Sequence, residues 1–327
     1  MFEPNLMTVK KSDFFEIKLY SSADKADWDR FVDASKNGTF LFRRDYMDYH
    51  ADRFSDFSVM VFRKGKLYAL LPANRRGATV VSHGGLTYGG LLLDSGARAE
   101  EVLRLFDCLM RFFAAGGVDE LVYKPVPYIY ASLPSDEDLY ALFRCNARLS
   151  ARNVSAVVDF ANPLPWSTMR RRALRKSEKA GVEATFSDDF ERFWALLSAN
   201  LDARYGAVPV HTLDEILRLR RLFADNIRLV CSYDARDEML AGAVLYVTDN
   251  VVHTQYLSAS PRGREVGGLD AAIALAMDKY RDRVRYFDFG TSNERDGLYL
   301  NESLIYHKEG FGARAVCYDT YTVNINL

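Results

Sequence analysis

The order of strands and helices predicted for residues 182–325 is partly repeated in residues 28–123, and this repetition constrains the fold more than any other feature. Apolar residues at helical or alternating spacing in the second half predict a strand, two helices, three strands, a helix, a strand, a helix and a final strand. The predicted ranges are 182–185, 188–204, 213–223, 227–233, 239–247, 251–257, a glycine-rich loop over 258–268, 269–280, a strand from Tyr286, a helix around Leu300, and 315–325.

The first half contains several of the same elements in the same order. They are a helix over 28–34, a hairpin over 58–62 and 66–72, a glycine-rich segment over 84–90, a helix over 100–115 and a strand over 120–123. A unit that recurs at about 150 residues indicates duplication, with a ligand expected in a cleft between the halves. Because Asn162-Pro-Leu-Pro interrupts regular structure, we expect two domains, residues 1–160 and 161–327.

Composition limits the classes of partner. The chain has 327 residues, 49% of them hydrophobic, with 43 Lys plus Arg against 44 Asp plus Glu. A net charge near zero gives no overall attraction to a polyanion such as DNA, so such a partner needs a local patch. We expect no DNA partner, no membrane span and a cytoplasmic location, because no apolar run is long enough to cross a bilayer and the start lacks a signal-like pattern. The four cysteines are far apart, and no metal-binding signature predicts a metal site.

The strand and helix order, with a loop between the fourth strand and the third helix, resembles the GNAT acyltransferase fold. In that fold, backbone amides of the loop and the helix N-terminus hold the pyrophosphate of acyl-CoA. Arg264, Gly267 and Gly268 match the first part of the family's loop motif, and Leu269 occupies its last small position. The resemblance implies an α/β (α+β) chain of two tandem GNAT-like domains, each a mixed, mostly antiparallel sheet flanked by helices, with acyl-CoA as co-substrate and no metal.

Three further segments narrow the resemblance. The basic segment 171–181, the Phe-Asp-Phe-Gly of 287–290 and the Lys-Glu-Gly-Phe-Gly of 308–312 resemble the Fem-like aminoacyltransferases and their bacterial relatives. Segments 203–212, 254–260 and 300–305 are more similar to the relatives, which are GNAT N-acetyltransferase-like proteins of surface polysaccharide biosynthesis.

The resemblance implies a GNAT-type N-acyltransferase that moves an acyl group from acyl-CoA, or a similar activated donor, to an amine of an amino sugar or cell-envelope precursor. Its partner is then a small molecule or glycan precursor. One alternative is a Fem-like peptidyltransferase that uses aminoacyl-tRNA and acts on a peptidoglycan precursor, and only this alternative involves tRNA. Another is a catalytically degenerate protein that binds such a precursor without turnover.

Amide formation requires a cation or donor for the carbonyl oxygen and a base for the amine proton. Lys308 is the predicted cation, and it shares a helix face with Asn301, seven residues earlier. A solvated lysine near a helix C-terminus is the alternative. Glu294 is the preferred base and Asp288 the second candidate, although both also suit structural roles at a strand end.

His253 and Gln255 alternate on the fourth strand, where a GNAT sheet splays open and a main-chain amide faces the acyl carbonyl. We expect His253 to be catalytic, although a histidine bonded within a sheet is the alternative. The predicted cofactor-binding residues are Gln255, Tyr256, Arg262, Arg264, Gly267 and Gly268, and the predicted substrate-binding residues are His211, Arg204, Tyr205, Asn301, Ser292 and Tyr88.

Two further segments have both a functional and a structural interpretation. The basic run from Arg170 to Lys179 could meet phosphates or form a solvated helix face. Gly84, Gly85, Gly89 and Gly90 could let the backbone approach a ligand closely or could serve turn geometry alone.

Overall fold

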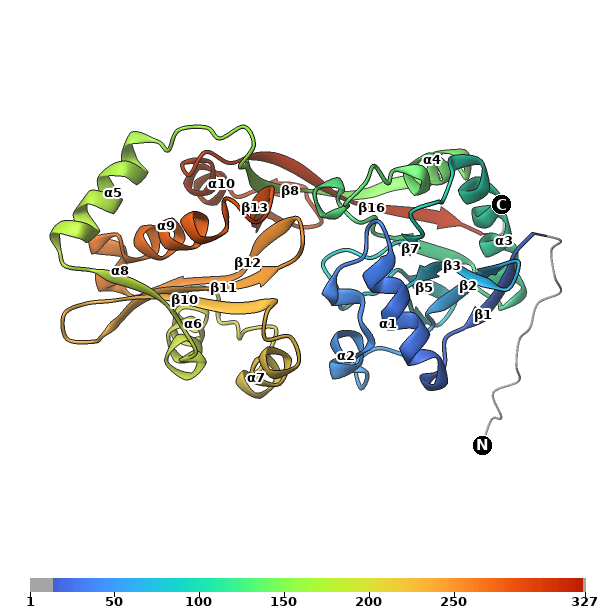
Figure 1. Ribbon diagram of the computed structural model, residues 1–327, viewed down its shortest axis with the longest axis horizontal. Helices are drawn as coiled ribbons and strands as arrows, with labels where there is room; N and C mark the ends of the chain where they lie inside the picture. The colour runs from blue at the N-terminus through green and yellow to red at the C-terminus, as the bar shows by residue number, and fades with distance from the viewer. Residues whose placement is uncertain (1–13, 326–327) are drawn as a thin grey trace. The chain divides into compact units, whose positions relative to one another are not determined.

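The computed structural model describes residues 14–325, except for the side chains of Arg204 and Tyr205, and separates into two compact units (Figure 1). Unit 1 comprises Met1–Asn153, Arg295–Leu298 and Cys317–Leu327, and unit 2 comprises Val154–Glu294 and Tyr299–Val316. This division differs from the expected boundaries 1–160 and 161–327 in two respects. The first boundary lies inside strand β8 (Arg148–Asp159), and the last residues return to unit 1.

The return is caused by strand β16 (Arg314–Asn324), which pairs antiparallel with β7 (Glu120–Tyr123) of unit 1. Tyr321 lies opposite Tyr123, and Val323 opposite Leu121. The Val323 side chain is buried in the core of unit 1. The last strand therefore completes the hydrophobic core of the first unit.

Unit 1 contains an antiparallel sheet in the order β1-β2-β3-β6 and a second run of strands, β4-β5-β7-β16, in which only β5 and β7 are parallel. The strands not yet bounded are β1 (Glu16–Leu19), β2 (Val59–Arg63), β3 (Lys66–Leu71), β4 (Asn74–Arg76), β5 (Thr79–Val81) and β6 (Leu92–Leu93). The helices are α1 (Lys25–Ala34), α2 (Arg44–Met47), α3 (Ala99–Ala115) and α4 (Glu137–Arg144), with 3-10 turns at Ser22–Asp24, Phe40–Phe42, Asp48–His50 and Tyr128–Tyr130.

Helix α3 supplies much of the core of unit 1. Its apolar residues recur every three or four positions, so they gather on one face of the helix. That face is buried against the strands and consists of Val102, Leu105, Phe106, Leu109, Phe112 and Phe113.

Unit 2 is built on one mixed sheet in the order β8-β13-β12-β11-β10-β9, in which only β12 and β13 are parallel. The strands are β9 (Glu183–Ser187), β10 (Ile227–Tyr233), β11 (Met239–Val247), β12 (Val251–Ala259) and β13 (Tyr286–Thr291), with a short hairpin of β14 (Asn293–Glu294) and β15 (Tyr299–Leu300). The helices are α5 (Thr168–Lys179), α6 (Phe190–Tyr205), α7 (Leu213–Leu222), α8 (Pro261–Val266), α9 (Gly268–Tyr280) and α10 (Glu302–Glu309).

In both units a mixed, mostly antiparallel sheet is flanked by helices, which confirms the predicted fold class. Strands β7, β10 and β11 have the bounds predicted from alternation, and α3 and α9 begin one residue earlier than predicted. The prediction of a loop over 258–268 was wrong, because α8 lies within it. Ser260 Oγ caps α8 by accepting from Gly263 N, Pro261 occupies the first turn, and Gly267 ends the helix at φ +80°.

Within residues 14–325, no helix combines the length and the apolar character that a bilayer crossing requires.

Candidate functional site

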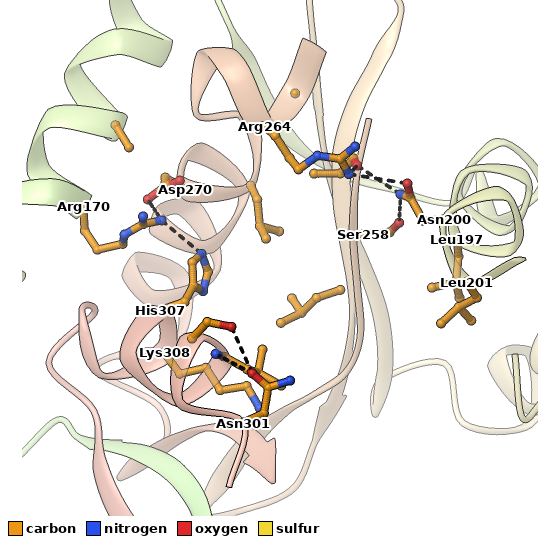
Figure 2. Close-up of a pocket in the computed structure, with 17 residues that line it drawn as sticks. Arg170, Leu197, Asn200, Leu201, Ser258, Arg264, Asp270, Asn301, His307 and Lys308 are labelled. Atoms are coloured by element: carbon orange, nitrogen blue, oxygen red, sulfur yellow. Dashed lines mark hydrogen bonds and ion pairs between the residues drawn. The ribbon is translucent and has the colours of Figure 1, made fainter. Parts of the chain in front are cut away.

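A cavity of about 560 Å³ opens in unit 2 between the end of strand β12 and five helices, α5, α6, α8, α9 and α10 (Figure 2). Its apolar part consists of five leucines and two alanines, and its polar part contains two arginines, a lysine, a histidine and an aspartate. The lining residues are Arg170, Ala173, Leu197, Asn200, Leu201, Leu257, Ser258, Ala259, Gly263, Arg264, Leu269, Asp270, Asn301, Ser303, Leu304, His307 and Lys308.

Lys308 lies on α10 and is only 4% exposed. Its Nζ donates to the carbonyl oxygens of Gly290, at 2.8 Å, and Thr291, at 2.7 Å. Burial lowers the pKa of Lys308 to about 8, against the opposing attraction of the buried Asp288 carboxylate. Lys308 is therefore a buried group at the cavity wall, and the alternative of a solvated surface lysine was wrong.

The buried Asp288 pairs with the partly buried His253, close to Lys308. The parallel register of β12 and β13 places the two residues opposite each other, and Asp288 Oδ2 lies 2.8 Å from His253 Nδ1. Asp288 Oδ1 accepts from Gly290 N at 2.8 Å and from Ser155 Oγ. Gly290 thus links the pair to Lys308, because its carbonyl accepts from the lysine. Since Asp288 is fully buried, it orients His253 and is closed to a substrate amine.

Three polar residues that the sequence did not single out as a group meet next to Lys308 in the cavity wall (Figure 2). Arg170 Nη1 lies 2.8 Å from Asp270 Oδ1 and donates to His307 Nε2 at 3.0 Å. Burial, helped by Arg170 and Lys308, lowers the pKa of His307 to about 4, and burial raises the pKa of Asp270. His307 is therefore neutral near pH 7, with its proton on Nδ1, because Nε2 accepts from Arg170.

The expected phosphate loop is folded and packed. Gly267 lies so close to α5 that a Cβ atom there would be 2.4 Å from the Ala173 carbonyl oxygen, and one on Gly268 would be 3.0 Å from Leu240 Cβ. The Asp270 carboxylate, in the first turn of α9, accepts from its own backbone N–H as well as from Arg170. A carboxylate already occupies the start of this helix, so these residues do not fit the pyrophosphate of acyl-CoA in the usual position.

The two arginines of this segment have different surroundings. Arg264 lines the cavity and donates to the Ala259 carbonyl at 2.6 Å, whereas Arg262 is exposed and pairs with Glu265. In the basic run, Arg170 lines the cavity while the other five cations, Arg171, Arg172, Arg175, Lys176 and Lys179, are exposed on α5.

Glu294, the preferred base, is exposed in the β14–β15 hairpin opposite Tyr299 and is not among the residues that line the cavity. The hairpin turns the strand end away from the polar cluster, which alternation along one strand could not reveal. Asn301 does line the cavity and caps α10, with Oδ1 accepting from Leu304 N at 3.1 Å. Ser292 is buried, and its hydroxyl has no hydrogen-bond partner within the described residues.

The remaining predicted residues lie outside the cavity lining. Tyr256 OH contacts His211 Nδ1 at 2.6 Å, and burial raises the pKa of Tyr256 to about 12. Gln255 sits at a bulge, because Val244 pairs with Tyr256 while the next residue, Leu245, pairs with Thr254. Tyr88 belongs to unit 1, and Arg204 and Tyr205 end α6 with side chains outside the described residues.

A search for metal ligands among the described residues finds no group of three His, Cys, Asp or Glu side chains placed to hold an ion.

Comparison with known proteins defines the class of unit 2. Residues 167–296 match the model of the acetyltransferase (GNAT) domain. No curated protein sequence matches the chain. The match covers most of the sheet and helices that surround the cavity, so unit 2 carries a GNAT domain, which supports an N-acyltransferase activity.

Solved structures extend the fold to the whole chain. The crystal structure of FemX aligns with a TM-score of 0.66 and 12% identity, over 95% of this chain and 98% of that chain. The C-terminal domain of a putative lysylphosphatidylglycerol synthetase from Agrobacterium fabrum aligns with a TM-score of 0.60 and 13% identity, over 93% and 92%. A tandem GNAT protein from the clavulanic acid biosynthesis pathway aligns with a TM-score of 0.53 and 12% identity, over 96% and 99%. These similarities show a tandem GNAT fold.

Proposed function

We propose that the cavity of unit 2 joins an activated acyl group to the amine of a cell-envelope precursor or amino sugar. The amine nitrogen attacks the acyl carbonyl carbon, the bond from that carbon to the carrier breaks, and the amine loses a proton. The observation that carries this proposal is the buried Lys308 ammonium at the cavity wall. A fixed cation in a partly dry site stabilises the negative charge that develops on the carbonyl oxygen.

His253 is our candidate for the group that accepts the amine proton. Asp288 Oδ2 accepts a hydrogen bond from His253 Nδ1, which leaves Nε2 to act as the proton acceptor. The same arrangement stabilises the imidazolium after proton transfer, because the Asp288 carboxylate is fixed by Gly290 N. Neither His253 nor Glu294 is among the residues that line the cavity, but His253 is linked to Lys308 through Asp288 and Gly290. Glu294 is exposed in the β14–β15 hairpin and is not retained in this role.

The leucine-lined part of the cavity suits the acyl group, because burial of an apolar chain against Leu197, Leu201 and Leu257 is favourable. Two molecules are candidates for the carrier of the activated acyl group, namely tRNA and coenzyme A. The Asp270 carboxylate at the start of α9 favours aminoacyl-tRNA over acyl-CoA, since a pyrophosphate there would meet a negative charge. Acyl-CoA remains the second candidate, because the matched domain model describes acetyltransferases.

A donor screen tests the proposal. The full chain is incubated with acetyl-CoA, longer acyl-CoAs or aminoacyl-tRNAs, each with amino sugars and peptidoglycan precursors, and amide products are detected by mass spectrometry. Product from aminoacyl-tRNA alone supports the peptidyltransferase, and product from acyl-CoA supports the N-acyltransferase of amino sugars. A chain that binds precursors but yields no product with any donor is a binding protein, which contradicts the proposal.

The role of Lys308 is tested with Lys308→Gln. Loss of the cation lowers kcat by about 100-fold or more if it stabilises the oxyanion. Lys279→Gln, which changes an exposed lysine on α9, is the matched control and keeps full activity. Thermal unfolding of both variants separates lost catalysis from lost folding.

A further inference from the structure

A second polar cluster lies in unit 1, at the carboxyl ends of the parallel strands β5 and β7. His83 follows β5 and Lys124 follows β7. The two ends are tied together, because Ser82 N donates to Val122 O at 2.9 Å and Lys124 N donates to Ser82 Oγ at 2.7 Å. Groups at the carboxyl ends of adjacent parallel strands face the same edge of a sheet, which is where ligands bind in open sheets.

Two cations of this cluster have no acidic partner within the described residues. Lys124 is half-buried and donates to the Leu86 carbonyl, and burial together with nearby Arg76 lowers its pKa to about 8. Arg76 is exposed and lies over the Phe54 ring, 5.9 Å from its centroid. A partly buried ammonium such as that of Lys124, without an acidic partner, costs free energy of folding, and a bound anion would offset that cost.

Two deeply buried polar side chains beside these cations also lack partners. Asn74 is 1% exposed, and although its Oδ1 accepts from Gly84 N at 2.6 Å, its Nδ2 has no hydrogen-bond partner within the described residues. His83 is 4% exposed, and its Nδ1 is likewise unpartnered there. Buried polar groups are normally satisfied, so two together point to a missing ligand.

The backbone around these side chains is held in an unusual conformation. His83 has φ +55°, in the left-handed region that costs a residue with a Cβ atom about 1 kcal/mol or more. The following Gly85 lies so close to a ring that a Cβ there would be 2.3 Å from His50 Nε2. Gly84 and Gly85 are exposed beside these residues, so the backbone there is open to a ligand.

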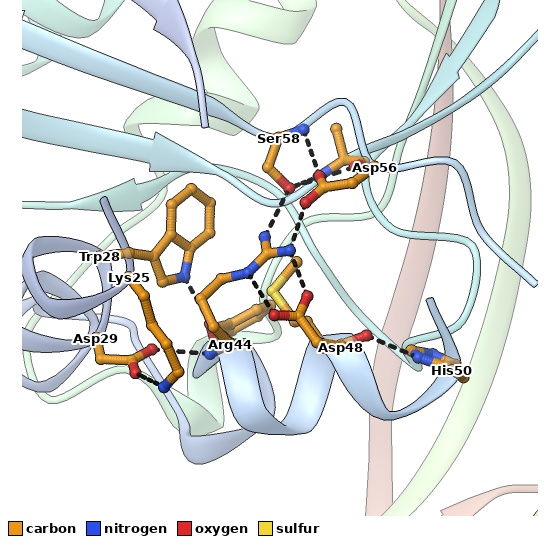
Figure 3. A network of polar contacts seen from close by, with 11 residues as sticks. Lys25, Trp28, Asp29, Arg44, Asp48, His50, Asp56 and Ser58 are labelled. Carbon is orange, nitrogen blue, oxygen red and sulfur yellow. Dashed lines mark hydrogen bonds and ion pairs between the residues drawn. The ribbon is translucent and has the colours of Figure 1, made fainter. Parts of the chain in front are cut away.

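Nearby acidic groups do not neutralise the cluster, because they serve another cation. Arg44, the buried first residue of α2, pairs with Asp48 and Asp56 (Figure 3). Its guanidinium also stacks on Tyr20, 3.9 Å from the ring centroid. Asp56 also accepts from Ser58 N at 2.7 Å. Both carboxylates are thus paired with Arg44, and neither pairs with Lys124 or Arg76 within the described residues.

We propose that Arg76, Lys124, Asn74 and His83 form a binding site for a phosphate group in unit 1. A phosphate offers several acceptor oxygens in different directions, which suits four donors from β4, the end of β5 and the end of β7. Arg76 and Lys124 neutralise its charge, while Asn74 Nδ2 and His83 Nδ1 donate from the buried side. The site is independent of the cavity in unit 2 and would hold the phosphate of a nucleotide-linked or lipid-linked precursor, or free phosphate.

Calorimetric titration of the full chain tests the site with inorganic phosphate, uridine 5′-monophosphate and glycerol phosphate. We expect all three to bind, and tighter binding of the nucleotide or of the glycerol ester identifies the source of the phosphate. Arg76→Gln and Lys124→Gln should each weaken binding about tenfold, the effect of one lost charge-assisted hydrogen bond. Arg111→Gln, at an exposed arginine of α3, is the matched control and should bind as the natural chain does.

Histidine NMR of the natural chain provides a second measurement, in which a substitution is needed only to assign a signal. The chain has five histidines, and the ring signals of His50 and His83 should shift with added phosphate while that of His253 stays constant. His83→Asn assigns the signal and keeps a residue that tolerates positive φ. Equal shifts in all five histidines, or equal affinity of Arg76→Gln and Arg111→Gln for phosphate, would overturn the proposal.

Discussion

The ammonium of Lys308 is held by two backbone carbonyls at the wall of the cavity, so its charge state controls the proposed chemistry. Its pKa is lowered to about 8, so the fraction carrying the charge falls as the pH rises through that value. We expect kcat/KM to decrease above about pH 8, whereas an ordinary lysine would remain charged to about pH 10. A pH–rate profile with a flat alkaline side to pH 10 would contradict a catalytic charge on Lys308.

Asp138, on α4, is a second single residue whose protonation we expect to affect the protein, here through its thermal stability. Its Oδ2 accepts from Tyr123 OH at 2.7 Å, and burial raises its pKa to about 7. Because the folded pKa is raised, the contribution of Asp138 to stability is complete below about pH 4 and is lost as the pH rises through 7. We expect Tm to fall more between pH 5 and pH 8 in the natural chain than in Asp138→Asn. Parallel pH dependence in the two proteins would show that Asp138 is not protonated in the fold.

The sequence predicted the position of a site residue only where neighbouring residues along the same helix or strand determine it. Asn301, which caps α10, and Lys308, which lies on α10, both line the cavity, as their spacing predicted. The group of Arg170, Asp270 and His307 was not predictable, because its members come from three different helices that are far apart in the sequence. Only the fold brings these helices together. The position of Glu294 away from the cavity lining was not predictable, because the β14–β15 hairpin, formed by two-residue strands, carries no recognisable pattern.

Among the elements, the junction between α8 and α9 is the most tightly constrained. Gly267 has φ +80°, and its Cα lies against the Ala173 carbonyl of α5. We expect Gly267→Ala to lower the free energy of unfolding by about 2 to 4 kcal/mol, since it combines backbone strain with a steric clash. Urea unfolding measures the change.

Gly181 supplies the control for that prediction. It has φ +65° but open space around the position of a Cβ atom, so Gly181→Ala reports the backbone cost alone, about 1 kcal/mol. If the two substitutions cost the same, the close packing of α5 on the α8–α9 junction is not a source of stability.

The sequence predicted long periodic elements well and short or unpatterned ones poorly. Strands β10 and β11 alternate or run apolar through the sheet, so their limits follow from burial. Strand β8 was missed because its first half is polar, from Arg148 to Asn153. Helix α8 was missed because six residues give no helical period, although its serine cap, proline and terminal glycine are a recognisable signal.

At the scale of the whole molecule, strand β16 serves both units. Val316 is buried in unit 2 and Val323 in the core of unit 1. We expect Val323→Ala to destabilise unit 1 by about 1 to 3 kcal/mol, seen as faster hydrogen exchange in β7 and α3. Val316→Ala, the same change on the same strand, should instead speed exchange in unit 2. Identical exchange patterns for the two variants would contradict the division.

The duplicated order of elements predicted two units, but it could not reveal that the last strand pairs with β7. Strand pairing between residues about 200 positions apart depends on tertiary contacts that no local period encodes. The predicted cleft between the halves stays a prediction.

The pairing of β16 with β7 also has a consequence for biosynthesis. While the ribosome is still making unit 2, the emerging first unit has one edge of β7 without its neighbour. The sheet of the unit that is translated first is thus completed only after the other unit has been made. Until then, the open edge of β7 is exposed to pairing with other chains, and a chaperone that covers it would prevent aggregation.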